Sequence, residues 1–454
     1  MRPSISPKKA KNLRKSRRSK VQTLKVITLG CSKNTVDTAH LLYQLKDSYE
    51  ILPAEQEGPV DVLLINTCGF IGDAKQQSID TILEAVEEGS AGRIIVFGCL
   101  SERYAAELPD LIPEVDGWFG ARDLKPLVEA LGGKYRPEDA HKRVIYDGVR
   151  PYAFLKISEG CDRRCSYCAI PLIRGPHRSV PEETLVAEAE SLAARGVKEL
   201  IVIAQDTTFY GLDLYGQRTL ARLLRKLSAV EGICRIRLHY SYPQGFPEDV
   251  LDEMAVNPKI CRYIDIPLQH ISDKVLSAMH RGIDGEQTRD LVRKMREKVP
   301  GVVLRTTMIV GHPGEGEAEF EELLSFVKEA RFERLGAFTY SEEEGTFGAE
   351  NLADDVPEDV KKQRLSRLMA LQEGISLDYN KSRVGSVETV LVDDFSDGVF
   401  VCRSEAESPE VDGEILVRYS PGEFGDNPYS IVGEQIDVRI TGCDSYDLIA
   451  EMVK

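Results

Sequence analysis

The segment EGCDRRCSYCAI, residues 159–170, contains three cysteines with the spacing C-x3-C-x2-C. An apolar run of strand length, AFLKIS at 153–158, precedes it, so Cys161, Cys165 and Cys168 are predicted on one loop at the end of a strand. Three thiolates on one loop can hold three irons of a cubane [4Fe–4S] cluster, because soft sulfur ligands suit iron–sulfur centres. The fourth iron is then open to a small molecule. The alternative is zinc at the second and third cysteines, although zinc usually takes a second C-x2-C pair, which the chain lacks.

Strand and helix patterns repeat after this loop. Apolar runs of strand length occur at 199–206, 234–240, 263–269, 302–311 and 334–341. Helical patterns lie between most of these runs, including those at 181–196, 217–230 and 316–332. Six strand–helix units in about 200 residues predict a partial (βα)6 barrel, followed by one long helix over 357–381.

The chain before the loop predicts a separate parallel α/β domain. Apolar strands at 24–30, 61–66 and 93–98 alternate with helical patterns at 40–50 and 74–89. Cys31, Cys68 and Cys99 each follow one of these strands directly or within a few residues, at separations of 37 and 31 residues. Because the carboxyl ends of parallel strands lie at one edge of a sheet, a second three-thiolate site is expected there. Three unrelated buried cysteines are the alternative.

The C-terminal part predicts a third kind of fold. From Arg383 onward, short alternating strands at 386–394, 398–404, 414–420 and 434–442 indicate a small all-β barrel. The predicted division of the chain is a basic disordered tail at 1–22, an N-terminal α/β domain at 23–140, a barrel core at 147–381 and the β-barrel at 383–452. The remaining cysteines share no common placement and are interpreted as structural thiols: Cys234, Cys261, Cys402 and Cys443.

Charge and composition restrict the class of protein. Of the 454 residues, 42% are hydrophobic and 29% charged, as in globular domains, and no apolar stretch approaches the ~20 residues of a membrane span. Residues 1–20 carry nine Lys/Arg and no acidic residue, so the net charge of −16 leaves about −25 for the rest, a poor generic nucleic-acid binder. The tail could contact RNA or the ribosome, or act as a solubilising extension. No apolar signal segment follows it, so we expect a cytoplasmic protein with reduced thiols and no membrane contact.

The cysteine loop after the first strand of a six-unit βα barrel resembles the radical S-adenosylmethionine (SAM) superfamily. The resemblance implies that the amino and carboxylate groups of SAM bind the open iron. Reduction of the cluster then cleaves SAM to a 5′-deoxyadenosyl radical, which breaks a strong, unactivated C–H bond. The stretch TTMIVGHPGE at 306–315 is similar to the superfamily's glycine-bearing strand near the SAM adenine and nominates Gly311 and Gly314 as cofactor contacts. Arg305 and Gln205 are nominated for the SAM carboxylate.

Both cysteine sets, the partial barrel and the terminal β-barrel together resemble the methylthiotransferases over about residues 23–452. In that family the domains are an N-terminal methylthiotransferase domain, a radical SAM core and a TRAM domain, whose signature is similar to VCRSEAESPEVDG at 401–413. The resemblance implies two [4Fe–4S] clusters, one on Cys161, Cys165 and Cys168 and an auxiliary one on Cys31, Cys68 and Cys99. It also implies that C–S–CH3 replaces C–H, with SAM supplying both the methyl group and the radical. A flavodoxin or ferredoxin is implied as electron donor, since no flavin or NAD motif is evident.

Three motifs resemble the branch of this family that modifies an aspartate of small-subunit ribosomal protein S-twelve. They are GCSKNTVD at 30–37, DIPLQHISDKVLSAMHRG at 265–282 and YSEEEGTF at 340–347. The tRNA branch, which modifies adenosine, lacks the Ser-Lys pair of the first motif and has Pro-x-Gln-Ser-Gly-Ser in the second. His270 and Asp273 are therefore expected near the substrate, or as caps of a helix beginning near Ser272. The chain departs from the usual first motif at Thr38-Ala39-His40, where an acidic residue is common.

The charge of the C-terminal barrel favours the same branch. Residues 383–454 hold 16 Asp/Glu and five Lys/Arg, a net charge of −11. An acidic barrel repels RNA and attracts a basic protein, whereas a merely solvated acidic surface is the alternative. The residues expected to contribute are Glu405, Glu407, Glu410, Asp412 and Glu414.

The sequence therefore predicts a methylthiotransferase that acts on the β-carbon of an aspartate in ribosomal protein S-twelve. A tRNA adenosine methylthiotransferase is the alternative within enzymes, and a non-catalytic iron–sulfur carrier is the alternative outside them. No catalytic side chain is assigned.

Overall fold

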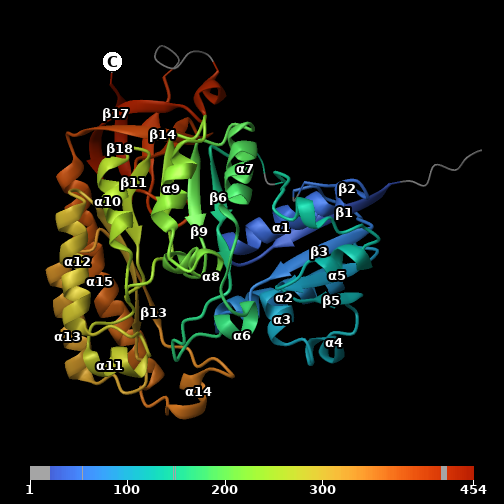
Figure 1. Cartoon of the computed structure of the whole chain (residues 1–454), viewed down its shortest axis with the longest axis horizontal. Coiled ribbons are helices and arrows are strands. Elements are labelled where there is room, and N and C mark those ends of the chain that lie inside the picture. Colours follow the sequence, from blue (N-terminus) through green and yellow to red (C-terminus); the bar gives the residue numbers. More distant parts are fainter. Residues whose placement is uncertain (1–20, 54, 147, 149, 421–426, 454) are drawn as a thin grey trace, which may run out of the picture.

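The computed structural model describes residues 21–453, apart from 54, 147, 149 and 421–426. The predicted tail at 1–22 thus lies almost entirely outside the described residues. Three bodies adjoin one another in Figure 1: an N-terminal α/β lobe from blue to teal, a central parallel barrel from green to orange, and a C-terminal β-barrel in red. Among the described residues, no helix combines the length and the apolar character needed to cross a bilayer.

The N-terminal lobe is a parallel sheet with the strand order β2-β1-β3-β4-β5. Its elements are β1 (Gln22–Thr28), α1 (Ser32–Leu45), β2 (Tyr49–Ile51), β3 (Val62–Thr67), α2 (Gly72–Glu88), β4 (Ile94–Gly98), α3 (Cys99–Arg103) and β5 (Gly117–Phe119). Every residue of β3 is buried, as expected for a strand covered by helices on both faces.

One sequence prediction in this lobe is wrong. The helix predicted over 40–50 ends at Leu45, and Tyr49–Ile51 form the edge strand β2 instead. The buried Tyr49 hydroxyl donates to the Leu131 carbonyl at 2.8 Å, so its partner lies far along the chain and the local helical pattern does not reveal it. The other edge strand, β5, also lies outside the predicted strands.

The central body is an open parallel sheet whose spatial order follows the chain, β6-β9-β10-β11-β12-β13. Its strands are β6 (Tyr152–Lys156), β9 (Glu199–Ile203), β10 (Arg235–Leu238), β11 (Ile260–Asp265), β12 (Val303–Val310) and β13 (Arg334–Thr339). The helices on its outer face are α7 (Glu182–Ala193), α9 (Leu220–Ser228), α10 (Glu248–Val256), α12 (Gly285–Lys298), α13 (Glu317–Ala330) and α15 (Glu358–Arg383). The predicted partial barrel of six βα units is confirmed.

Helix α1 of the N-terminal lobe lies against the inner face of this barrel near its β6 edge (Figure 1). Val36 packs against Phe154 of β6 and Ile203 of β9, whose side chains face away from the outer helices. Residues 33, 36, 37 and 40 recur at helical spacing and share this face of α1. The helix that follows Cys31 therefore faces the barrel interior directly.

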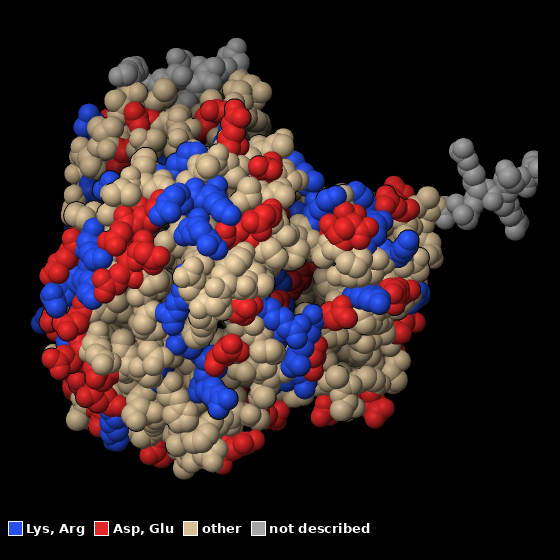
Figure 2. Space-filling model, in the orientation of Figure 1, with Lys and Arg blue, Asp and Glu red and all other residues tan. Residues whose placement is uncertain are grey.

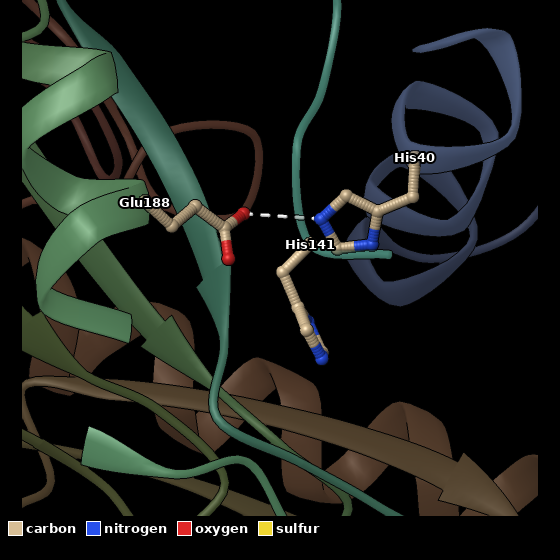
Figure 3. A group of neighbouring side chains, drawn as sticks. All are labelled: His40, His141 and Glu188. Carbon is tan, nitrogen blue, oxygen red and sulfur yellow. Dashed lines mark hydrogen bonds and ion pairs between the residues drawn. The ribbon is translucent and has the colours of Figure 1, made fainter. Parts of the chain in front are cut away.

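A polar cluster strengthens this contact (Figure 3). His40 Nε2 of α1 lies 3.1 Å from Glu188 Oε1 of α7, and His141 of the connecting segment lies beside them. The three side chains bring ligand atoms within 4.8 Å of one another, as a metal site requires. However, Arg143 forms an ion pair with the same carboxylate, which balances its charge. We therefore interpret the group as a buried ion-pair cluster between domains.

The motif YSEEEGTF forms a second contact between lobe and barrel. Glu343 is buried and accepts hydrogen bonds from Arg103 at 2.7 Å and from Lys75 at 2.9 Å, both from the N-terminal lobe. The Tyr104 hydroxyl also donates to the Glu344 carboxylate at 3.0 Å. This motif therefore holds the N-terminal lobe on the barrel.

The C-terminal domain is a closed barrel with the strand order β14-β15-β16-β18-β17. Its strands are β14 (Val387–Ser396), β15 (Val399–Arg403), β16 (Ile415–Arg418), β17 (Gln435–Cys443) and β18 (Leu448–Met452). The predicted all-β barrel is confirmed, although β18 lies outside the predicted strands.

Residues 404–412, between β15 and β16, insert into the amino end of the central barrel, and we name this segment the barrel plug. Arg237 of β10 donates to the Glu405 carbonyl at 2.7 Å, and Tyr263 of β11 donates to the Asp412 carboxylate at 2.6 Å. Since these partners lie within strands of the central sheet, the plug closes the barrel interior from the end opposite the cysteine loop.

The plug corrects the interpretation of the acidic C-terminal charge. Glu407 is enclosed by ion pairs with Arg334 and Arg383, and Asp412 faces the barrel interior, so neither belongs to an exposed acidic surface. Of the five carboxylates expected there, those on Glu405, Glu410 and Glu414 are exposed. Figure 2 shows acidic and basic side chains intermixed over the face in view. The charge argument for a basic partner therefore rests on fewer carboxylates than the sequence count implies.

Candidate active site

The loop that carries Cys161, Cys165 and Cys168 leaves the carboxyl end of β6. Gly160 begins it with a φ of +76°, and a Cβ there would lie 2.1 Å from the Pro176 carbonyl oxygen, so glycine is required at this position. Burial raises the pKa of the Cys161 thiol to about 12 and also raises that of Cys168, and the neighbouring Cys165 adds to both shifts. The metal-free thiols of Cys161 and Cys168 therefore hold their protons, and binding of metal must release them.

Two arginines fix this loop. Arg163 donates to Asp206, just after β9, at 2.8 Å, and its guanidinium stacks 3.8 Å from the centre of the Tyr242 ring. Arg281 donates to Cys165 Sγ at 3.4 Å. The Arg281 contact places positive charge beside a sulfur atom that becomes anionic when it binds iron, which favours the bound state.

The second set, Cys31, Cys68 and Cys99, follows the adjacent strands β1, β3 and β4. A Cβ on Gly30 would lie 2.7 Å from Cys68 Cβ, so glycine allows the first two strand ends to approach closely. Burial raises the pKa of Cys68 to about 11, with further contributions from Cys99 and Cys31. The structure brings these cysteines together at one sheet edge, and that they hold a cluster remains a prediction.

Helix α6 (Ile170–Arg174) connects the two cysteine sets. It begins two residues after Cys168, and Ala169 and Ile173 pack against Cys99. Arg174, its last residue, donates from Nε and Nη2 to Cys99 Sγ, both at 3.2 Å. The two sets therefore lie on either side of one five-residue helix.

The donors around both sets fit iron–sulfur clusters. Each set offers three sulfurs, and each contains a sulfur that accepts N–H hydrogen bonds from a buried arginine, Arg281 at Cys165 and Arg174 at Cys99. The backbone N–H of Arg163 also points to Cys161 Sγ at 3.4 Å. Hydrogen bonds to the sulfurs are one of the means by which proteins stabilise and tune such clusters.

The turn after β12 lies beside the cysteine loop, since His312 Nε2 is 3.4 Å from Ser166 Oγ. Gly311 and Gly314 in this turn have φ values of +76° and +84°. A Cβ on Gly311 would meet the Lys361 side chain at 2.3 Å, so packing against α15 already requires that glycine. The position of the turn supports the nomination of both glycines as SAM contacts, and the nomination remains a prediction.

Arg305 and Gln205, nominated for the SAM carboxylate, both have protein partners. Arg305 donates to Asp265 at 2.9 Å inside the barrel. Gln205 donates to Glu159, two residues before Cys161, at 2.6 Å, and its buried Oε1 has no partner among the described residues. Gln205 thus lies next to the cysteine loop, and both assignments remain predictions.

His270 and Asp273 stabilise loops. His270 is fully buried, its Nδ1 accepts from the Ser272 N–H at 3.0 Å, and its Nε2 lies 3.4 Å from Glu315. Asp273 accepts from the Gly285 N–H at 2.7 Å. Neither side chain caps α11 (Asp273–Ala278), so the capping interpretation is wrong, and the burial of His270 leaves it no open face toward a substrate.

Lys33, Asp37 and Tyr240, to which the sequence assigned no individual role, lie at the boundary between lobe and barrel. Lys33 Nζ lies 3.0 Å from the centre of the Tyr240 ring, and Asp37 forms ion pairs with Lys156 and Arg174. Lys33 and Asp37 belong to the motif GCSKNTVD, and their helical spacing is the one signal that could have grouped them. No pattern within a single sequence indicates that this helix face meets the barrel.

Comparison with known proteins agrees with this geometry. Residues 155–327 match the radical SAM superfamily, residues 384–453 match the TRAM domain, and residues 23–120 match a family described as uncharacterized protein family UPF0004. The fold and the cysteine loop thus define the class: a radical SAM enzyme with a TRAM domain. This class implies an iron–sulfur cluster and SAM as cofactors.

Similar proteins of known name identify the family within this class. The ribosomal protein uS12 methylthiotransferase RimO of Christiangramia forsetii is 49% identical over 98% of this chain and 96% of its own length. The protein of the same name from Porphyromonas gingivalis is 50% identical over 94% of this chain and 98% of its own. The chain therefore belongs to the RimO family of ribosomal protein uS12 methylthiotransferases.

Among solved structures, TsrM from Kitasatospora setae, a radical SAM methyltransferase with cobalamin and a [4Fe–4S] cluster bound, is similar in fold. It is 17% identical, with a TM-score of 0.54, and the match covers 72% of this chain and 77% of that one. At this identity the likeness supports the shared fold alone.

Proposed function

We propose that this enzyme replaces a hydrogen on the β-carbon of an aspartate in ribosomal protein uS12 by a methylthio group, with SAM as both methyl donor and radical source. The observation that carries the proposal is α6, which has the SAM-type cysteine loop at one end and Cys99 of the second set at the other. The identity of about 50% with uS12 methylthiotransferases along nearly the whole chain favours uS12 over tRNA adenosine.

In this proposal the two cysteine sets hold two clusters with different roles. Cys161, Cys165 and Cys168 would hold the SAM-cleaving cluster, and Cys31, Cys68 and Cys99 would hold the auxiliary one involved in sulfur transfer. When bound, the first cluster supplies the electron that cleaves SAM to the 5′-deoxyadenosyl radical. The protein's own part is to orient and enclose: the two arginines hold the loop, α1 covers the interior from the side, and the plug closes the amino end.

Two further partners are proposed, an electron donor and ribosomal RNA. We further propose a flavodoxin or ferredoxin as the external electron donor and the cytoplasm as the location. The nine Lys/Arg in residues 1–20 support a contact with ribosomal RNA, since phosphate neutralisation supplies most non-specific affinity for nucleic acid.

The function is tested with anaerobically reconstituted enzyme, SAM, a reductant and inorganic sulfide as the sulfur source, incubated separately with uS12 and with tRNA. We expect one methylthio group on a uS12 aspartate by mass spectrometry and unmodified adenosine in the tRNA. The Cys31/Cys68/Cys99→Ala variant should keep about half of the roughly eight irons per chain that two cubanes supply, and should form 5′-deoxyadenosine without product. Cys234→Ala, at the opposite end of the barrel, is the matched control and should match the unmutated enzyme. Methylthiolated adenosine with unmodified uS12 would instead establish the tRNA activity.

A further inference from the structure

Lys33 places an ammonium group inside the barrel. It lies in the first turn of α1, two residues after Cys31, on the same helix face as Val36, which packs against the inner strands. Its Nζ lies 3.0 Å from the centre of the Tyr240 ring, and the residue is 8% exposed. Tyr240 follows the end of β10, so the ammonium sits at the same end of the barrel as the cysteine loop.

The described residues give this ammonium neither a hydrogen bond nor an ion pair. The neighbouring cations at the interface are all paired: Lys156 with Asp37 and Glu159, and Arg174 with the same two carboxylates. An aromatic ring is a weak partner for a cation that has lost most of its water. Lys33 is therefore a buried positive charge that lacks an anion.

The nearby protein carboxylates are already engaged. Asp265 accepts from Arg305 at 2.9 Å and from the Tyr240 N–H at 3.0 Å, while Glu159 accepts from Lys156, Arg174 and Gln205. Among the described residues these carboxylates are not available to the ammonium, and a bound ligand can supply one. Two ligands of the proposed reaction carry a carboxylate, SAM and the substrate aspartate, and the superfamily resemblance assigns the SAM carboxylate to iron.

We propose that Lys33 is a specificity-determining residue that binds the side-chain carboxylate of the substrate aspartate. This inference rests on the proposed function. The β-carbon is bonded directly to that carboxyl carbon, so an anchor two residues from Cys31 also holds the reacting atom near the N-terminal cysteines. The same contact explains selection of aspartate, because an amide in its place would leave the ammonium without a counter-charge.

A substrate exchange combined with an enzyme exchange tests the contact. Reconstituted holoenzyme is assayed on uS12 with its target aspartate and on the same protein with asparagine there, and kcat/KM is compared between unmutated enzyme, Lys33→Gln and Lys33→Arg. We expect the unmutated enzyme to favour aspartate by about 10- to 100-fold, the worth of a hydrogen bond between charged groups. Lys33→Gln should lose most of that factor on aspartate, so that the ratio falls toward one, and Lys33→Arg should retain most of it.

Two controls separate recognition from folding. Lys25→Gln removes a lysine of β1 whose exposed ammonium donates to the Gln56 carbonyl, and it should keep the full preference for aspartate. Iron content and 5′-deoxyadenosine formation without uS12 should be the same in Lys33→Gln as in unmutated enzyme, since among the described residues no hydrogen bond joins the ammonium to either cysteine set.

Three results would overturn the inference. Equal rates of the unmutated enzyme on aspartate and asparagine would show that no carboxylate is recognised, and this result requires no variant. An unchanged preference in Lys33→Gln would exclude this residue. Loss of SAM cleavage without uS12 in that variant would assign the ammonium to SAM. By contrast, no product on aspartate-containing uS12 with the unmutated enzyme would refute the proposed function itself, and the inference with it.

Discussion

Arg174 is the residue through which the two cysteine sets are joined. Its guanidinium is buried and donates to Cys99 Sγ, to Asp37 at 2.6 Å and to Glu159 at 3.1 Å. Burial raises the pKa of Glu159, but the charges of Lys156 and Arg174 outweigh this effect and lower the pKa to about 2. Two cations and two carboxylates thus balance one another at the boundary between lobe and barrel.

Removal of this guanidinium should affect both stability and metal content. Arg174→Gln leaves the buried Asp37 and the partly buried Glu159 with one cation, which should lower the free energy of unfolding by about 3 kcal/mol. The variant should also lose iron from the N-terminal set after reconstitution, because Cys99 loses both N–H donors. Denaturant unfolding and iron per chain measure the two effects. Arg293→Gln, which removes an exposed arginine whose partners Asp290 and Glu297 are exposed too, should change stability by no more than about 0.5 kcal/mol. Iron and stability unchanged in Arg174→Gln would contradict this account.

Single residues differ in how far the sequence predicts them. Cys31, Cys68 and Cys99 could be brought together from strand ends alone, since the topology of a parallel sheet fixes where those ends lie. Arg174 could not be placed beside Cys99, because the two are 75 residues apart and belong to different domains. The same holds for Lys33 and Tyr240, whose contact depends on how the lobe docks.

At the scale of elements, the barrel plug turns a segment of the C-terminal domain into part of the barrel interior. Glu407 in the plug accepts from Arg334 at 3.0 Å, from the Ser404 hydroxyl at 2.7 Å, and from Arg383. Despite burial, Arg383 and Arg334 lower the pKa of Glu407 to about 2. The Glu407 carboxylate therefore stays ionised and joins the barrel plug to β13 and α15.

The plug predicts unequal effects for two neighbouring glutamates. Glu407→Gln removes one partner of buried ion pairs and should reduce the free energy of unfolding by about 3–5 kcal/mol. Glu405→Gln, an exposed change two residues away, should alter it by about 0.5 kcal/mol or less. Urea unfolding followed by circular dichroism makes the comparison. Equal effects of the two changes would mean that the plug does not dock in solution.

Element boundaries show where periodicity fails. The long interior strands and the helix near 357–381 follow the patterns, because burial on one face or both repeats along each element. The strands β2 and β5 are not predicted, because three residues are too few to show the alternation of buried and exposed side chains. Each of these strands is stabilised by hydrogen bonds to its neighbour in the sheet. The plug also escapes detection because its partners are polar side chains of another domain.

At the scale of the whole molecule, buried polar contacts join the three bodies alongside small apolar clusters such as that of Val36 with Phe154 and Ile203. Glu343 with Arg103, Glu188 with Arg143, and the Arg174 group each cross from the N-terminal lobe or its connecting segment to the barrel. The sequence predicts the three bodies from their internal patterns. Their arrangement depends on individual charge pairs, which composition and periodicity do not encode.

These contacts make the joined state sensitive to acid, and His141 provides the test. Burial, together with repulsion from His40, lowers the pKa of His141 to about 4, below the ordinary value of about 6.5. Lys156 and Arg143 oppose its protonation as well, while Glu188 favours it. Between pH 6.5 and 4 the unfolded chain therefore binds a proton at this position that the folded chain does not. The free energy of unfolding should fall as the pH is lowered through this window, and the contribution of His141 should be absent above it.

His141→Gln removes the titrating group, so the free energy of unfolding of the metal-free protein should depend less steeply on pH between 6.5 and 4 than in the unmutated protein. The remaining slope belongs to the other buried histidines with lowered pKa, His177, His239 and His312. Burial raises the pKa of Glu188, but Arg143 and His40 outweigh it and lower this pKa to about 2. Below pH 4.5 both proteins should therefore lose further stability, because protonation of Glu188 breaks its ion pair with Arg143. Lys142→Gln, an exposed change in the same segment, is the control, since a lysine does not titrate in this range. Urea titrations at half-unit pH intervals measure the slopes; a slope in His141→Gln equal to that of the unmutated protein would show that this histidine is not shielded at the domain boundary.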